Sequence, residues 1–410
     1  MANILLVILI TLVAAYVFSE FFRFLKLPRV LGQILAGLIL GLPLIREYLF
    51  DYDALSVFSF LTNIGIILLF FFLGLEINLR EFQKNFKKSI LISIFNTIMP
   101  LFLGFIAARA LFNLDNITSL IIGISLSVSS QAISLDILDE AKLLKSKIGN
   151  LIMTSGAVDD VFELIAVSIV LVIFQTAIAG FISLQRLFIN ILIFVAIVFV
   201  FRLTLIPFAL KSFEKDRSQA VLFMGALIIV LLMAYLSEVF GISSLIGALI
   251  AGILVRQTLV TGEDRKPWRK NEISHFIHVI SFGFLIPIFF VNVGLQTDIS
   301  LISSNLYLAF VLLVIDIVGT LFGTMMGVAF SQGTVKEGMI VGWGIVPKGD
   351  TELVIATLAL NGGLITINIY TAIITVALAS TFIAPIIFRM LIKKYGVGEY
   401  KLMNKRKTNV

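Results

Sequence analysis

Long apolar segments follow one another along nearly the whole chain, separated by short turns that carry charged residues, glycine or proline. Most segments reach about 20 residues, the length that an α-helix needs to cross the hydrocarbon core of a bilayer. The pattern therefore predicts an all-α, polytopic membrane protein with a single transmembrane domain over residues 1–410. The same pattern predicts about thirteen spans, near residues 3–22, 30–46, 54–75, 89–112, 117–138, 148–176, 184–210, 218–238, 242–256, 273–295, 301–331, 337–360 and 365–388.

The composition agrees with a membrane protein and argues against several other classes. Hydrophobic residues make up 59% of the chain and charged residues 14%, whereas about 25% of an ordinary soluble domain is charged. The first span has neither a basic start nor a small-residue cleavage site, so we expect a retained helix and no signal peptide. With no cysteine and with only His275 and His278 as histidines, the chain favours neither a zinc nor a haem site. We expect no cofactor, no enzymatic activity and no nucleic-acid partner.

The basic residues are distributed unevenly among the turns. If the N-terminus lies outside, most of the 31 lysine and arginine residues fall in cytoplasmic turns, and the outer turns keep only Arg46, Arg109 and Arg186. This bias follows the positive-inside rule, and an even number of spans would destroy it. We therefore predict a protein of the cytoplasmic (inner) membrane with its N-terminus outside and its C-terminus inside.

Two short motifs of the first half return in the same order in the second half. Leu31–Gly37 (LGQILAG) is echoed by Ile246–Gly252 (IGALIAG), and Phe71–Leu75 (FFLGL) by Phe290–Leu295 (FVNVGL). The echoes follow their partners by about 215 to 220 residues. Because the matched spans are separated by an odd number of crossings, the two halves are predicted to be inverted repeats, an arrangement common in secondary transporters.

Ionisable residues inside the spans gather at one depth. Asp159 and Asp160 lie about 17 Å into the sixth span. Lys348 lies at the same depth in the twelfth, and Asp316 is midway along the eleventh. Glu163 stands one helical turn after Asp159. A charge at this depth costs about 2.5 to 3.5 kcal/mol on insertion scales, so such residues mark ion pathways or paired structural sites.

Asp159 and Asp160 are the candidate site for a monovalent cation, Na⁺, and for protons. Two adjacent carboxylates can bind a cation through their oxygen atoms or hold protons instead, so the two ions compete. The competing interpretation is a buried polar cluster that only locks helices together. For Lys348, a structural salt bridge to Asp159 or Asp316 and a direct role in proton transfer remain open, and for Asp316 we prefer a structural pair with Lys348.

Two spans contain stretches that interrupt a helix. The fifth holds the hydroxyl-rich segment Ser125–Ala132, with Ser129 and Ser130 at its centre. The twelfth holds Gly342–Glu352, where Pro347 removes a backbone donor. The two stretches occupy matching places in the repeats, so we expect two broken helices that cross near the aspartates, although a serine run alone more often marks a helix-packing surface. Further polar residues expected to support the site are Ser155, Asp350 and Glu352.

Three motifs resemble the monovalent cation:proton antiporters, in particular their Kef and Nap branch, across essentially the whole chain. Gly156–Val161 (GAVDDV) resembles the double-aspartate signature of the Nap-type sodium/proton antiporters. Phe71–Glu76 (FFLGLE) resembles the third-span motif of the branch, and Pro347–Asp350 (PKGD) is similar to its Pro-Arg-Gly-Glu motif.

The resemblance implies a homodimer in which a core moves as an elevator against a scaffold. It places the scaffold and dimerisation helices at 1–80 and 218–298, the ion-transport core at 86–177 and 301–394, and a linker helix at 184–212. It also implies that Asp160 is the principal cation ligand and that Asp159 is its proton-carrying neighbour, with Ser129 and Ser130 near the crossing.

The chain departs from the family pattern at several positions. Asp316 stands where many members carry lysine or arginine, and Glu163 stands where glycine is usual. Because the sequence ends at Val410, we expect no nucleotide-binding regulatory domain of the kind that Kef-type systems append.

The leading hypothesis is exchange of Na⁺ or Li⁺ for H⁺, and the alternative is K⁺/H⁺ exchange. A membrane sensor or channel without coupled exchange and an organic-anion symporter are the competing classes. The expected partners are a monovalent cation, protons, the lipid bilayer and a second copy of the chain.

Overall fold

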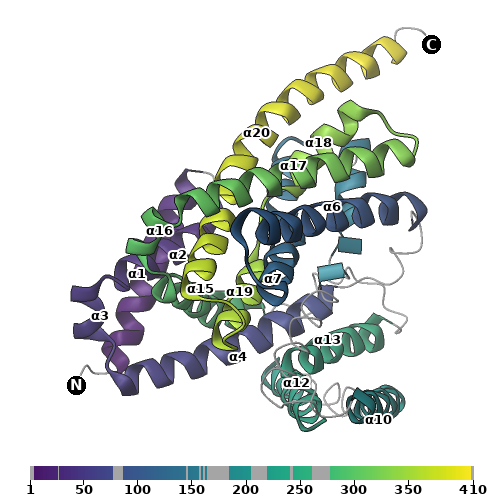
Figure 1. The fold of residues 1–410 in the computed structure, drawn as a ribbon. Helices are drawn as coiled ribbons and strands as arrows, with labels where there is room; N and C mark the ends of the chain where they lie inside the picture. The colour runs from purple at the N-terminus through teal and green to yellow at the C-terminus, as the bar shows by residue number, and fades with distance from the viewer. Residues whose placement is uncertain are drawn as a thin grey trace. The chain divides into compact units, whose positions relative to one another are not determined.

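The computed structural model in Figure 1 is a helical protein. It describes residues 4–25, 27–76, 86–144, 146–156, 158–159, 162–163, 184–204, 219–240, 243–260 and 278–407. Within these ranges every regular element is a helix and none is a strand, which confirms the predicted all-α class. Six helices of the described ranges are long and apolar enough to cross a membrane, or up to seven if a bent pair counts as one span. The chain is therefore a multi-pass membrane protein, while the total of thirteen spans stays a prediction.

The chain divides into two compact units, each assembled from both halves of the sequence. Unit 1 comprises Met1–Glu20, Gly32–Ile77 and Ser168–Gln296, and unit 2 comprises Phe21–Leu31, Asn78–Val167 and Thr297–Val410. The scaffold, core and linker roles assigned to sequence ranges stay predictions.

Part of unit 1 packs around a core of aliphatic and phenylalanine side chains from α1 to α4 and α15. Apart from the end of α1 and the start of α2, the unit contains α1 (Ile4–Phe24), α2 (Arg29–Leu40), α3 (Pro43–Leu49), α4 (Tyr52–Glu76), α10 (Leu184–Leu203), α12 (Gln219–Val239), α13 (Ser244–Val260), the π-helix η2 (Ser281–Leu285) and α15 (Ile286–Gln296).

Unit 2 has its own core, in which α6, α8, α17, α18, α20 and a helix over residues 147–156 bury isoleucine, leucine, valine and Phe388 side chains. Its helices are α6 (Phe86–Phe112), α7 (Asn116–Ser127), α8 (Ala132–Glu140), α16 (Ile299–Ser304), α17 (Leu306–Phe330), α18 (Val335–Ile345), α19 (Asp350–Asn361) and α20 (Ile367–Lys407). The N-terminus of α7 is capped by Asp115, whose carboxylate accepts from the backbone N–H groups of Ile117 and Thr118.

Both predicted interruptions are present in unit 2. Helix α7 ends at Ser127 and α8 begins at Ala132, while α18 ends at Ile345 and α19 begins at Asp350. In the second case Pro347 and Gly349 lie in the gap, where a missing N–H and a flexible backbone end the helical hydrogen bonding.

The second predicted span, 30–46, is wrong as a continuous helix. Helices α2 and α3 meet at an angle of 84°. The cause is local, because proline disfavours the helical region for the residue before it. Leu42 accordingly has φ −59° and ψ 137°, and Pro43 starts the new helix at a position where its missing N–H costs nothing.

Three other predicted spans also differ from the structure in detail. The eleventh span is divided at Asn305, which ends α16 and precedes α17. In the tenth, the π-helix η2 interrupts the α-helical hydrogen bonding shortly before Pro287. The last span continues to Lys407, well beyond the predicted end at residue 388.

The order of helices supports the predicted repeat. Helices α1 and α12 both contain 21 residues, and the broken pair α7–α8 has its counterpart in α18–α19. Each counterpart starts about 215 to 220 residues after its partner, the same spacing as the sequence echoes.

Glycines of the echoed motifs pack against each other twice within unit 1. A Cβ atom on Gly294 would lie 2.8 Å from the Cα of Gly37, and a Cβ atom on Gly74 would lie 3.1 Å from the Cα of Gly252. The first motif of each half thus contacts the second motif of the other half. Such reciprocity is what a two-fold relation between the repeats requires.

We expect alanine at either crossing to destabilise unit 1, because a methyl group would overlap with backbone that cannot move aside. Gly252→Ala should lower stability by about 1 to 3 kcal/mol, the usual range for overpacking, measured as a fall in the thermal unfolding midpoint in detergent. The control is Gly283→Ala, since a Cβ atom there meets nothing within 4 Å. Equal midpoints for the two variants would contradict the tight crossing.

Candidate ion-binding site

Asp159 is buried in unit 2, with 3% of its surface exposed, and three side chains donate hydrogen bonds to it. The Ser93 hydroxyl donates to Oδ1. The Gln131 Nε2 donates to Oδ2 at 2.6 Å, and the Asn96 Nδ2 lies 3.5 Å from the same oxygen. A carboxylate has about four lone-pair directions, so the three donors among the described residues orient it and leave one of these directions for a cation or a proton.

The donors come from two places that the fold brings to the aspartate. Ser93 and Asn96 stand three residues apart on one face of α6, and Gln131 lies in the break between α7 and α8. Gly156 makes room for the glutamine, because a Cβ atom at this position would overlap with the Gln131 Oε1. The glycine of the GAVDDV motif is therefore explained by the passage of a neighbouring side chain.

The remaining predicted carboxylates and Ser155 have different surroundings. Asp160 lies outside the described residues. The Glu163 Oε1 accepts a hydrogen bond from the backbone N–H of Ser129 at 2.8 Å, so it is tied to the break of the fifth span. The buried Ser155 donates to the Ile152 carbonyl of its own helix at 3.3 Å. Asp350 is the first residue of α19, and its side chain lies outside the described part of the structure.

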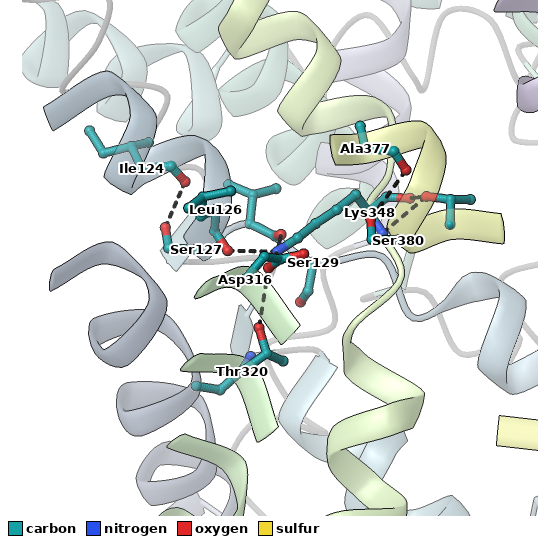
Figure 2. Close-up of polar contacts among 12 residues, drawn as sticks. Ile124, Leu126, Ser127, Ser129, Asp316, Thr320, Lys348, Ala377 and Ser380 are labelled. Carbon is teal, nitrogen blue, oxygen red and sulfur yellow. Dashed lines mark hydrogen bonds and ion pairs between the residues drawn. The ribbon is translucent and has the colours of Figure 1, made fainter. Parts of the chain in front are cut away.

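Lys348 extends from the gap between α18 and α19 to Asp316 on α17 (Figure 2). Its Nζ lies 2.7 Å from Asp316 Oδ1, and the two side chains are only 1% and 0% exposed. The same Nζ donates to the carbonyl oxygens of Leu126 at 2.6 Å and Val128 at 2.7 Å. An ammonium group has three N–H donors, and here all three have acceptors.

The predicted contact between the two breaks is confirmed by their backbones. The Ser130 N–H donates to the Pro347 carbonyl at 2.7 Å. One turn further along α8, the Ser134 hydroxyl donates to the Gly344 carbonyl at 2.6 Å. Gly349 is the closest point, because a Cβ atom there would lie 2.5 Å from the Cβ of Ser130.

Helix α20 also holds the break of the twelfth span in place. The Lys348 backbone N–H donates to the Thr381 hydroxyl oxygen at 3.2 Å, and the Thr381 O–H donates back to the Lys348 carbonyl at 2.9 Å. The lysine is thus fixed at its backbone as well as at its side chain.

Of the two partners that the sequence left open for Lys348, the structure selects Asp316, so the preferred pairing is confirmed. Whether Lys348 also transfers protons stays a prediction. Thr320 lies one turn from Asp316 with its hydroxyl 3.4 Å from Oδ1. Among the described residues the other oxygen, Oδ2, has no hydrogen-bond partner.

Sequence reasoning did not single out Ser93, Asn96 or Gln131. A signal was present in α6, where Ser89, Ser93 and Asn96 recur at helical spacing along an otherwise apolar segment. It did not reveal which carboxylate these side chains would meet. In the described ranges no group of three or more His, Cys, Asp or Glu residues could hold a metal ion.

Comparison with known proteins places these features in context. Residues 8–394 match the protein family described as "Sodium/hydrogen exchanger, transmembrane". The chain is 29% identical over 391 residues to a Na(+)/H(+) antiporter of Enterococcus hirae, covering 95% of this chain and 98% of that protein. It is 26% identical over 358 residues to the Na(+)/H(+)-K(+) antiporter GerN of Bacillus cereus, covering 87% and 88%.

A solved structure shares the fold. The similarity to the sodium proton antiporter MjNhaP1 from Methanocaldococcus jannaschii has a TM-score of 0.70 and covers 94% of this chain and 96% of that chain, at 15% sequence identity.

The buried pair generates a stability prediction. Lys348→Met leaves the Asp316 carboxylate and two carbonyl groups without their donor, and removing one partner of a buried pair costs about 3 to 5 kcal/mol. We expect a large fall in the thermal unfolding midpoint, and partial recovery in Lys348→Met/Asp316→Leu, which removes both charges.

The control for this prediction is Lys147→Met, which removes a pair of similar length on the surface. Lys147 lies 2.6 Å from Glu337, but its side chain is 57% exposed, so its loss should change stability by about 1 kcal/mol or less. If Lys348→Met unfolds no more readily than Lys147→Met, the buried pair does not stabilise unit 2.

Proposed function

Because the chain belongs to the sodium/hydrogen exchanger family, we propose that it exchanges Na⁺ for H⁺ across the cytoplasmic membrane through Asp159 and Asp160. The observation that carries the proposal is the buried Asp159 carboxylate beside the two crossing breaks, held by three donors with one direction left open. A group in this setting can hold either ion. Competition at one site couples the movement of Na⁺ to the movement of H⁺. The protein carries Na⁺ across the membrane in one direction and returns with H⁺, which has replaced Na⁺ at the carboxylates.

The chain's own residues would perform three tasks in this mechanism. Ser93, Asn96 and Gln131 orient Asp159, so that its free lone pair points to one place. The contact between the breaks brings freed backbone groups near the carboxylates, where they add oxygen ligands for a cation. Lys348 holds the crossing together by binding the carbonyl groups at the end of α7.

We propose an elevator-type movement in which unit 2 carries the site. Two observations support it. The chain separates into two compact units, and the described residues that bind the side chains of Asp159 and Lys348 belong to unit 2, so that these contacts can move together. We also propose that the protein is a homodimer, with its N-terminus outside and its C-terminus inside, as the distribution of basic residues indicates.

Potassium is the second candidate cargo, because the relative GerN has both Na(+) and K(+) in its name. Lithium is a further candidate, since its compact ion also suits carboxylate oxygens. The choice among the three ions is an outcome of the transport assay described next.

The proposal predicts that both aspartates are needed for exchange. Reconstituted protein should show sodium-driven dequenching of a pH-sensitive dye, and Asp159→Asn and Asp160→Asn should each reduce it to the level of empty vesicles, because an amide cannot exchange a proton for a cation. Asp51→Asn is the matched control, since Asp51 caps α4 through the Ala54 N–H and asparagine retains this hydrogen bond. Full exchange in Asp160→Asn would disprove the shared site.

Repeating the transport assay with potassium and with lithium in place of sodium identifies the transported cation.

The positioning donors give a second prediction. Ser93→Ala removes one hydrogen bond to Asp159, and a hydrogen bond to a charged group contributes about 1.5 to 3 kcal/mol. The half-maximal sodium concentration should rise by about tenfold or more, with a smaller change in the maximal rate. In Ser89→Ala, one turn earlier on α6, neither should change, because the Ser89 hydroxyl has no hydrogen-bond partner among the described residues. Equal kinetics in the two variants would show that Ser93 does not position the carboxylate.

A further inference from the structure

Glu352 is a buried carboxyl group that the mechanism above does not use. It lies in the first turn of α19, four residues after Lys348, and none of its surface is exposed. Neither of its carboxylate oxygens has a hydrogen-bond partner within the described ranges. Asp159 provides the contrast, since it is buried to a similar degree but accepts from three side chains.

An ionised carboxylate is not stable in the place where Glu352 lies. Removing an ion from water costs several kcal/mol even after the protein relaxes, and hydrogen bonds are the usual compensation. Since Glu352 receives none from the described residues, the neutral carboxyl form suits this conformation. A proton is also the smallest ligand that can remove the charge without adding volume.

The surroundings of Glu352 nevertheless contain groups that favour its ionised form. Lys348 attracts a negative charge on Glu352, and Asp316 repels it. The first turn of a helix also favours an anion through the helix dipole. Helices α7 and α20 pack against α19 as well, but α7 and the stretch of α20 before Arg389 contain no charged residues.

Full compensation of an ionised Glu352 requires a change of partners or the entry of water. All three N–H donors of Lys348 are occupied by Asp316 and by the carbonyls of Leu126 and Val128. In the arrangement observed, Lys348 can therefore act on Glu352 only through space. A rearrangement of the crossing would free a donor, and opening of the core would admit water, so ionisation of Glu352 requires a change within unit 2 or access of water to it.

We propose that Glu352 is a proton-binding site separate from the aspartate pair, which is protonated in this conformation and releases and regains its proton once per exchange cycle. This inference rests on the sodium/proton exchange proposed above. On release, the O–H bond of the carboxyl breaks, the proton passes to water and the electron pair stays on the carboxylate, where Lys348 and the start of α19 stabilise it. Uptake reverses these changes.

The decisive measurement is the number of protons exchanged per sodium ion. Opposed sodium and proton gradients across proteoliposomes are varied until net flux stops, and the balance point gives the ratio. Glu352→Gln keeps the shape of the neutral carboxyl but cannot release a proton, so we expect continued exchange with one proton fewer per sodium ion. Glu238→Gln, the same change at an exposed position of α12, should retain the wild-type ratio.

Infrared spectroscopy tests proton binding without any transport. The wild-type protein should show a carboxyl C=O band from a protonated, buried group that disappears in Glu352→Gln and remains in Glu238→Gln. If Glu352→Gln does not fold, Glu352→Met serves in both measurements, because methionine has a similar volume and places no polar atom without a hydrogen-bond partner in the interior.

The outcomes separate this inference from the function on which it rests. An unchanged ratio in Glu352→Gln, or a wild-type protein without the Glu352-dependent band, overturns the inference. A changed half-maximal sodium concentration with an unchanged ratio also overturns it, because Glu352 would then be a cation ligand. If the wild type exchanges no sodium but shows the band, the proposed function fails while proton binding by Glu352 holds.

Discussion

The arrangement of unit 2 depends on the need to satisfy every donor of one buried ammonium group. Lys348 cannot remain charged in an apolar interior unless each N–H finds an acceptor, and the two broken helices provide what an intact helix could not. Because α7 stops at Ser127, the carbonyls of Leu126 and Val128 are free to accept from the lysine. Asp316 on α17 completes the set and balances the charge. The Lys348 side chain therefore connects the twelfth-span break to the end of α7 and to α17, and the broken helices provide its acceptors.

Three carboxyl groups that are buried to a similar degree differ in the donors and charges around them, and these neighbours determine what each group can bind. Within the described ranges, Asp159 accepts hydrogen bonds from α6 and from the fifth-span break, Asp316 pairs with a lysine, and Glu352 has no hydrogen-bond donor and experiences charges through space. If burial alone decided their chemistry, the three carboxyl groups would behave in the same way. The placement of amide, hydroxyl and ammonium donors distinguishes a group that can bind a cation, a group held in a salt bridge and a group that suits a proton.

Much of this organisation could be predicted from the sequence, and the failures have identifiable causes. The apolar segments predict the helices, and Pro347 and the serine run predict the two breaks. Charged residues of opposite sign are scarce within the spans, so few partners were possible and Asp316 could be matched with Lys348. The sequence did not identify Ser93, Asn96 and Gln131 as donors to Asp159. Neutral polar side chains are common in membrane helices, and the rotation of each helix about its axis decides which group such a side chain meets. The 84° bend at Leu42 was missed although Pro43 signals it, because an uninterrupted apolar run outweighed one residue in the assignment.

The glycine crossings of unit 1 limit how the two halves of the chain can diverge. Elsewhere in a protein, a larger residue at one position can be accommodated by a smaller residue at its neighbour. Where Gly37 meets Gly294 and Gly252 meets Gly74, the atoms that a Cβ would meet first belong to the main chain, which every residue type shares. A second substitution therefore does not restore the fit, and these two crossings are points at which neither half of the chain can change its sequence independently.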